Sequence, residues 1–132
     1  MTHPRLSLSA VVLDAPDASE LADFYRRLLG WEIKVDEGDW VMLRRPDDGT
    51  SLSFQTEEFY VRPVWPGAQG DQLMMLHLDI EVDDLDEAGA HAVAQLKNTC
   101  SRLRVTSLWP VLQARRSTRA SSSFCTATIS VL

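Results

Sequence analysis

The sequence has few cysteines and no long apolar run, and both features narrow the kinds of protein it can be. Only Cys100 and Cys125 are present, too few and too poorly patterned for a disulfide framework or a zinc knuckle. No stretch reaches the roughly 18 apolar residues that a membrane-spanning helix needs, and the first residues contain no apolar segment ending in a small-residue cleavage site. We therefore expect a soluble, cytoplasmic protein.

Several short functional motifs are also missing. There is no nucleophile elbow of the Gly-x-Ser-x-Gly type, no phosphate-binding glycine loop, no dinucleotide fingerprint and no Cys-x-x-Cys pair. These absences argue against hydrolase, nucleotide-binding and thiol-redox functions. The formal net charge of −6 argues against a nucleic-acid partner.

Acidic residues are missing from the last part of the chain. All 19 Asp and Glu residues lie at or before Glu87, whereas residues 96–132 hold six basic residues and no acidic one. The two parts of the chain therefore differ in composition more than one uniform domain would.

A repeat is the most informative feature that is present. Residues 10–20 reappear in modified form at 77–87, always at the same offset. The repeat covers a strand-like segment and the start of a helix, which indicates an internal duplication in which each copy supplies half of one enclosed structure. We expect the functional site to lie between the two copies.

The first copy, residues 6–56, predicts a β-α-β-β-β unit. Asp17 with Glu20 forms a capping box, and Gly30 is placed to end a helix whose apolar residues share one face. Strands are predicted at 8–14, 31–35, 40–44 and 51–55, and the alternation at 31–35 places Ile33 and Val35 on one half-buried face.

The second copy, residues 73–132, is predicted to follow a linker at 57–72 that is rich in Pro and Gly around Trp65. A strand is expected at 73–82, then a helix capped by Asp84, then three more strands. The chain is thus predicted to be a single α+β domain, 1–132, of two modules.

Three segments, 11–17, 21–31 and 76–85, resemble the vicinal-oxygen-chelate superfamily, in particular glyoxalase-like and bleomycin-resistance-like proteins. The most specific is Phe-Tyr-Arg-Arg-Leu-Leu-Gly-Trp within 21–31. The resemblance covers about residues 6–96 and implies two curved half-sheets that form a cup, with a ligand or metal on the concave face. Residues 97–132 depart from the family pattern, and we hypothesise that this segment is read from a shifted frame or is otherwise non-native.

The resemblance also implies metal-ligand positions on the first and fourth strands of each module. Ala10 stands at the first position and has no donor atom, His77 matches the second, and Gln55 stands where a carboxylate is expected. His77 is thus the only matching ligand position. We expect no complete metal site and name no cofactor with confidence, although a divalent metal remains the alternative.

The expected ligand-binding residues are few. The predicted strand 73–82 places His77 and Asp79 on one face, Asp14 and Gln55 belong to the first module, and Trp65 stands in the linker as a wall for a flat ligand. His77 is equally well explained as a structural histidine that is hydrogen-bonded to Asp79 or to a backbone carbonyl. Asp79 is equally well explained as a solvated carboxylate at the edge of the sheet.

Three functions follow from these patterns. The first is a protein that binds a small organic molecule in the cup, without a complete metal site; no residue is assigned a catalytic role. The second is a metal-dependent lyase, isomerase or dioxygenase. The third is a damaged domain that retains the first module and half of the second.

Exposed sheet edges in an incomplete second module also predict a homodimer.

Overall fold

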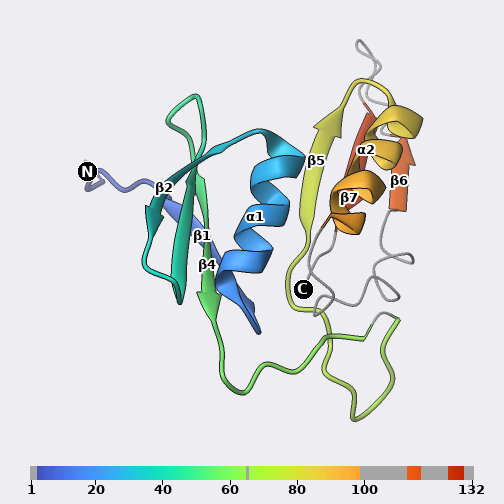
Figure 1. Cartoon of the computed structure of the whole chain (residues 1–132), viewed down its shortest axis with the longest axis horizontal. Coiled ribbons are helices and arrows are strands. Elements are labelled where there is room, and N and C mark those ends of the chain that lie inside the picture. The colour runs from blue at the N-terminus through green and yellow to red at the C-terminus, as the bar shows by residue number, and fades with distance from the viewer. Residues whose placement is uncertain (1–2, 65, 99–112, 117–124, 130–132) are drawn as a thin grey trace. The chain divides into compact units, whose positions relative to one another are not determined.

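The computed structural model describes residues 3–64, 66–98, 113–116 and 125–129 (Figure 1). The chain divides into two compact units, Met1–Tyr60 and Val61–Leu132, which are described separately. Within the described residues, neither helix is long and apolar enough to cross a membrane.

The first unit has the predicted β-α-β-β-β order. Its sheet has four strands in the order β1-β4-β3-β2, in which β1 and β4 are parallel and the other pairs are antiparallel. The α+β class predicted from the sequence is confirmed. The elements are β1 (Ala10–Ala15), α1 (Ala18–Leu29), β2 (Glu32–Asp36), β3 (Trp40–Arg44) and β4 (Ser51–Thr56).

Helix α1 begins and ends where its capping residues predict. The Asp17 carboxylate accepts a hydrogen bond from the Glu20 N–H at 3.0 Å, which satisfies one of the free donors of the first turn. At the other end Gly30 adopts φ +70°, and its N–H donates to the Arg26 carbonyl at 2.9 Å. Both ends of the helix are therefore fixed by local sequence.

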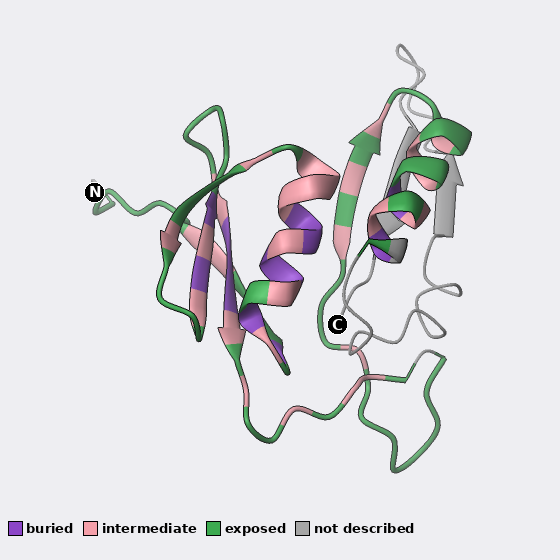
Figure 2. Ribbon diagram, in the orientation of Figure 1, coloured by how far each residue is buried: buried purple, intermediate pink, exposed green. Residues whose placement is uncertain are grey.

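The hydrophobic core of the first unit lies between α1 and one face of the sheet (Figure 2). Tyr25 of α1 stacks on Phe54 of β4 with ring centroids 5.4 Å apart, and Phe24 meets Tyr25 edge-on at 5.2 Å. The strand residues that face the helix are fully or almost fully buried: Leu13, Ala15, Val41, Leu43, Leu52 and Phe54. Alternation along each strand directs the intervening side chains to the opposite face.

Strand β2 departs from the prediction that Ile33 and Val35 share a face. Ile33 is paired with Leu43 and Val35 with Met42, so the register shifts by one residue between them. Because Leu43 and Met42 project to opposite faces, so do Ile33 and Val35. The predicted common face is wrong, and a β-bulge at Lys34 is the cause.

The second unit is built around a three-stranded sheet in the order β5-β7-β6, in which both pairs are antiparallel. Helix α2 is capped by Asp84, whose carboxylate accepts from the Glu87 N–H at 2.8 Å. The elements are β5 (Leu78–Val82), α2 (Leu85–Lys97), β6 (Gln113–Arg116) and β7 (Cys125–Ile129).

One prediction for the second module differs from the structure, and another falls partly outside the described residues. The strand expected at 73–82 spans only 78–82, because Leu73 forms an isolated bridge with Val64 and the residues between lie outside the ladder. Two of the three strands expected after α2 are described, and residues 99–112 and 117–124 of this segment lie outside the described residues. Within the described residues, the second sheet therefore differs from the first in the order of its strands.

Candidate functional site

The candidate site is the face of the first sheet that α1 does not cover. Ladder partners lie side by side on the same face, so the register defines two rows across the strands. One row runs from Val12 through Ser53 and Met42 to Val35. The second consists of Asp14, Gln55 and Trp40. We call these the Ser53 row and the Asp14 row.

The Ser53 row is apolar except for Ser53 itself. Val12 is 42% exposed and Met42 and Val35 are half-buried, whereas Ser53 has no exposed surface. The Ser53 hydroxyl has no hydrogen-bond partner in the described part of the chain. A buried hydroxyl without a partner destabilises a fold by about 1–3 kcal/mol. Such a cost is expected where a residue serves a function rather than packing.

The Asp14 row brings together two residues that the sequence named as ligand-binding. Asp14 and Gln55 are direct partners in the parallel β1–β4 ladder, with Asp14 exposed and Gln55 half-buried. Trp40 pairs with Gln55 from the other side and is also half-buried. A carboxylate, an amide and an indole thus follow one another across three strands.

Sequence reasoning named neither Ser53 nor Trp40 as a site residue. The signal for both was the alternation of their strands. Trp40 precedes Val41, which is buried against the helix, and Ser53 lies between the helix-facing Leu52 and Phe54. Applying the period of two to both strands would have placed Trp40 and Ser53 on the uncovered face.

The turn that joins β3 to β4 is held by ion pairs. Arg44 meets Asp48 at 2.6 Å and Arg45 meets Asp47 at 2.7 Å, all four side chains being largely exposed. The hydrogen bond from Arg44 lowers the pKa of the Asp48 carboxyl. Exposed pairs of this kind contribute little stability, so we regard them as ordering the turn that aligns the two strands of the rows.

His77 and Asp79 lie in the second unit, His77 just before β5 and Asp79 within it. The His77 Nε2 and the Asp79 Oδ1 are 3.8 Å apart, and the two side chains are 54% and 57% exposed. This separation exceeds a hydrogen bond. The structure brings these two predicted residues near each other but does not bury them, and Trp65 lies outside the described residues.

The residues at the expected ligand positions of the first module do not fit a metal centre. Of the positions that the superfamily uses in the first module, Ala10 has no donor atom and Gln55 offers a neutral amide. No group of three or more His, Cys, Asp or Glu side chains suited to a metal ion occurs among the described residues. We therefore derive no chemical step through a metal.

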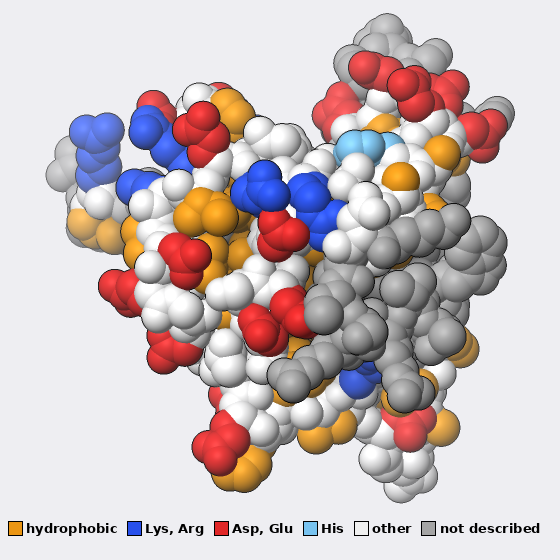
Figure 3. Space-filling model, viewed as in Figure 1, with side chains coloured by type: hydrophobic (Ala, Val, Ile, Leu, Met, Phe, Trp, Pro, Cys, Tyr) orange, Lys and Arg blue, Asp and Glu red, His pale blue; other side chains and the backbone are white. Residues whose placement is uncertain are grey.

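Hydrophobic side chains are exposed on the first unit among charged ones, as Figure 3 shows.

A model of the glyoxalase-like domain matches residues 10–95, which include the whole first sheet, β5 and most of α2. No curated protein matches the chain, and no solved structure does. Because the match spans more than half of the sequence, the chain belongs to the glyoxalase-like domain family.

Proposed function

We propose that the protein binds a small organic molecule on the uncovered face of the first sheet, across the Ser53 and Asp14 rows. Ser53 is the observation that carries this proposal. A serine with no exposed surface and no partner is unfavourable for folding alone, but it is useful where a ligand completes its hydrogen bonding.

The side chains around Ser53 supply the other contacts that such a ligand needs. Val12, Met42 and Trp40 offer apolar surface, and Gln55 offers both a donor and an acceptor. Met42 is unbranched and adaptable, so it is the neighbour that can move aside and open Ser53 to a ligand. Apolar walls with a few polar groups are typical of small-molecule sites.

Binding accounts for these two rows better than turnover does. They contain one carboxylate, Asp14, and no histidine, cysteine or lysine. Neither row pairs a nucleophile with a base within one hydrogen-bonded unit, as covalent catalysis requires. Binding in a cup between the two modules, which the family resemblance implies, stays a prediction, as does the contribution of His77 and Asp79.

The first test uses N-phenyl-1-naphthylamine, a neutral aromatic probe that fluoresces in apolar surroundings. We expect saturable binding that Trp40→Ala weakens about tenfold, because loss of an indole contact is equivalent to roughly 1–2 kcal/mol. Trp31→Ala is the matched control, since Trp31 is also half-buried but lies outside both rows. Equal losses in the two variants would contradict the proposal.

Ser53→Ala tests the residue on which the proposal depends. We expect higher thermal stability, since an unpartnered buried hydroxyl is removed, together with probe binding that is weaker by about fivefold. Higher stability with unchanged binding would mean that Ser53 is only a packing defect, and the proposal would then fail.

A further inference from the structure

The Asp14 row has the composition of a site for a positively charged group. We propose that the ligand of the uncovered face is an organic cation: a flat apolar molecule whose protonated amine or quaternary nitrogen lies over the Asp14 row. This inference rests on the proposed function and names its ligand class. It is argued from charge, from the aromatic ring in the row and from Ser53.

Asp14 supplies a negative charge that no other described residue neutralises. The side chain is exposed, and no ion pair joins it to another residue in the described part of the chain. Arg44, which lies on the same strand as Trp40, is paired instead with Asp48 at the far end of β3. The carboxylate is therefore available to a cationic ligand.

Trp40 and Gln55 complete the recognition of a cation. The face of an indole ring attracts cations more strongly than any other side-chain ring, and the Gln55 carbonyl is an acceptor for an ammonium N–H. Both residues are half-buried and lie in the same row as Asp14. A carboxylate, a carbonyl and an aromatic face together favour a cation over a neutral or anionic group.

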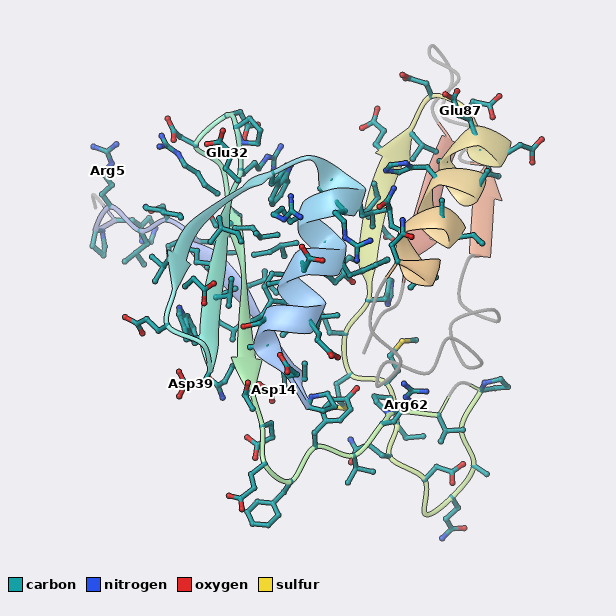
Figure 4. The ribbon with its side chains drawn as sticks, viewed as in Figure 1. Arg5, Asp14, Glu32, Asp39, Arg62 and Glu87 are labelled. Carbon is teal, nitrogen blue, oxygen red and sulfur yellow. The ribbon has the colours of Figure 1, made fainter. Side chains whose placement is uncertain are left out.

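The charge of the surrounding surface favours the same ligand. Asp14 and Asp39 lie at one end of the first sheet and Arg5 and Glu32 at the other (Figure 4). The segments 14–17, 36–39 and 55–58 meet at the Asp14 end, and none of them contains Lys or Arg. Their acidic residues are Asp14, Asp17, Asp36, Glu37, Asp39, Glu57 and Glu58. An anionic molecule would meet an unfavourable potential there.

Ser53 gives this surface a second, independent mark of a ligand site. It neighbours Gln55 on the same face of β4, two residues away, and its hydroxyl is buried without a partner among the described residues. A cation held over the Asp14 row would place its apolar body over the Ser53 row, beside Val12 and Met42. Both rows are then used by one molecule.

The test compares two probes of the same shape that differ in charge. Thioflavin T carries a benzothiazolium cation, and 2-(4-dimethylaminophenyl)benzothiazole is its uncharged analogue. We expect calorimetry to show that the cation binds about tenfold more tightly, which one exposed charge contact together with a cation–π contact can provide. We also expect this preference to fall as the salt concentration rises.

Asp14→Asn is expected to weaken thioflavin T about fivefold or more and to leave the neutral analogue unchanged. Glu32→Gln is the matched control, because it removes one negative charge from an exposed strand residue at the other end of the sheet. An equal loss in both variants would mean that only net charge matters, and would overturn the inference.

The remaining outcomes separate this inference from the proposed function. If both probes bind equally and Asp14→Asn changes neither, the cation preference is wrong while the binding function stands. If neither probe binds saturably, the binding function itself fails. If probe binding falls as protein concentration rises, a second copy of the chain occupies the face, and the inference is again overturned.

Discussion

Tyr25 is the second buried hydroxyl without a partner, and replacing it offers a sharp test of the core. Its side chain has no exposed surface, and its oxygen makes no hydrogen bond within the described residues. Tyr25→Phe keeps the ring that stacks on Phe54 and removes only that oxygen. The unpartnered hydroxyl costs about 1–3 kcal/mol, partly offset by the dispersion attraction between its oxygen atom and the surrounding core. We expect the variant to be more stable by about 1 kcal/mol.

The effect of pH provides a second expected difference. Burial raises the pKa of the Tyr25 phenol above its ordinary value of 10.0. Below pH 10 the phenol is protonated in both the folded and the unfolded chain, so pH does not change the stability through this group. Above it the unfolded chain loses the proton while the folded chain keeps it, so stability falls by about 1.4 kcal/mol per pH unit. Tyr25→Phe lacks this loss, so its advantage over the wild type should widen.

The assay is urea unfolding followed by circular dichroism, at neutral pH and again near pH 11. Tyr60→Phe is the control, because it removes a phenol from a half-buried residue that lies beyond β4. A Tyr25→Phe variant that is clearly less stable at neutral pH, or an advantage that stays constant up to pH 11, would refute the reasoning. The first result would mean that the hydroxyl is stabilised in the native protein, and the second that the phenol ionises as readily in the folded chain as in the unfolded chain.

Three further predictions concern the helices and the oligomeric state. Asp17→Ala and Asp84→Ala each remove a helix-capping hydrogen bond and should each lower the free energy of unfolding by about 1 kcal/mol in urea titrations. Asn at either position can still cap the helix and should retain most of the wild-type stability. Gly30→Ala should lower the free energy of unfolding by about 1 kcal/mol because of its φ of +70°. Gly89→Ala lies inside α2, and its added Cβ would meet no atom within 4 Å apart from its chain neighbours and the backbone of its own helix, so it should raise the free energy of unfolding by up to about 1 kcal/mol in the same titrations. Light scattering should show a homodimer, because β1 and β5 are edge strands of their described sheets and because apolar side chains are exposed. A monomer across micromolar protein concentrations would contradict this prediction.

Much of the first module could be predicted because its signals are local. A capping box, a helical period and a left-handed glycine each act within a few residues, and Asp17, Glu20 and Gly30 perform these roles as predicted. The bulge at Lys34 could not be predicted in this way. It depends on how β2 is aligned with β3, which no pattern within 31–35 specifies.

The candidate site was predictable only in part for the same reason. Gln55 was named from the family resemblance and Asp14 from the alternation of its strand, and the parallel ladder brings them together. Ser53 lies between Val12 and Met42 across the sheet, and both residues are far from it in sequence. Its polarity alone does not identify a serine as a site residue. The missing hydrogen bond is visible only when the packing is known.

Within the described residues, the duplicated sequence does not produce two sheets with the same strand arrangement. Three antiparallel strands follow α1, so the last of them, β4, runs parallel to β1 and lies beside it. In the second unit β7 lies beside β5 and runs in the opposite direction. In the repeat, His77 and Asp79 correspond to Ala10 and Val12, yet within the described residues β5 has no parallel neighbour to form rows like those of the first sheet. The binding surface that we propose is therefore built from the first module alone, and it can be tested there residue by residue.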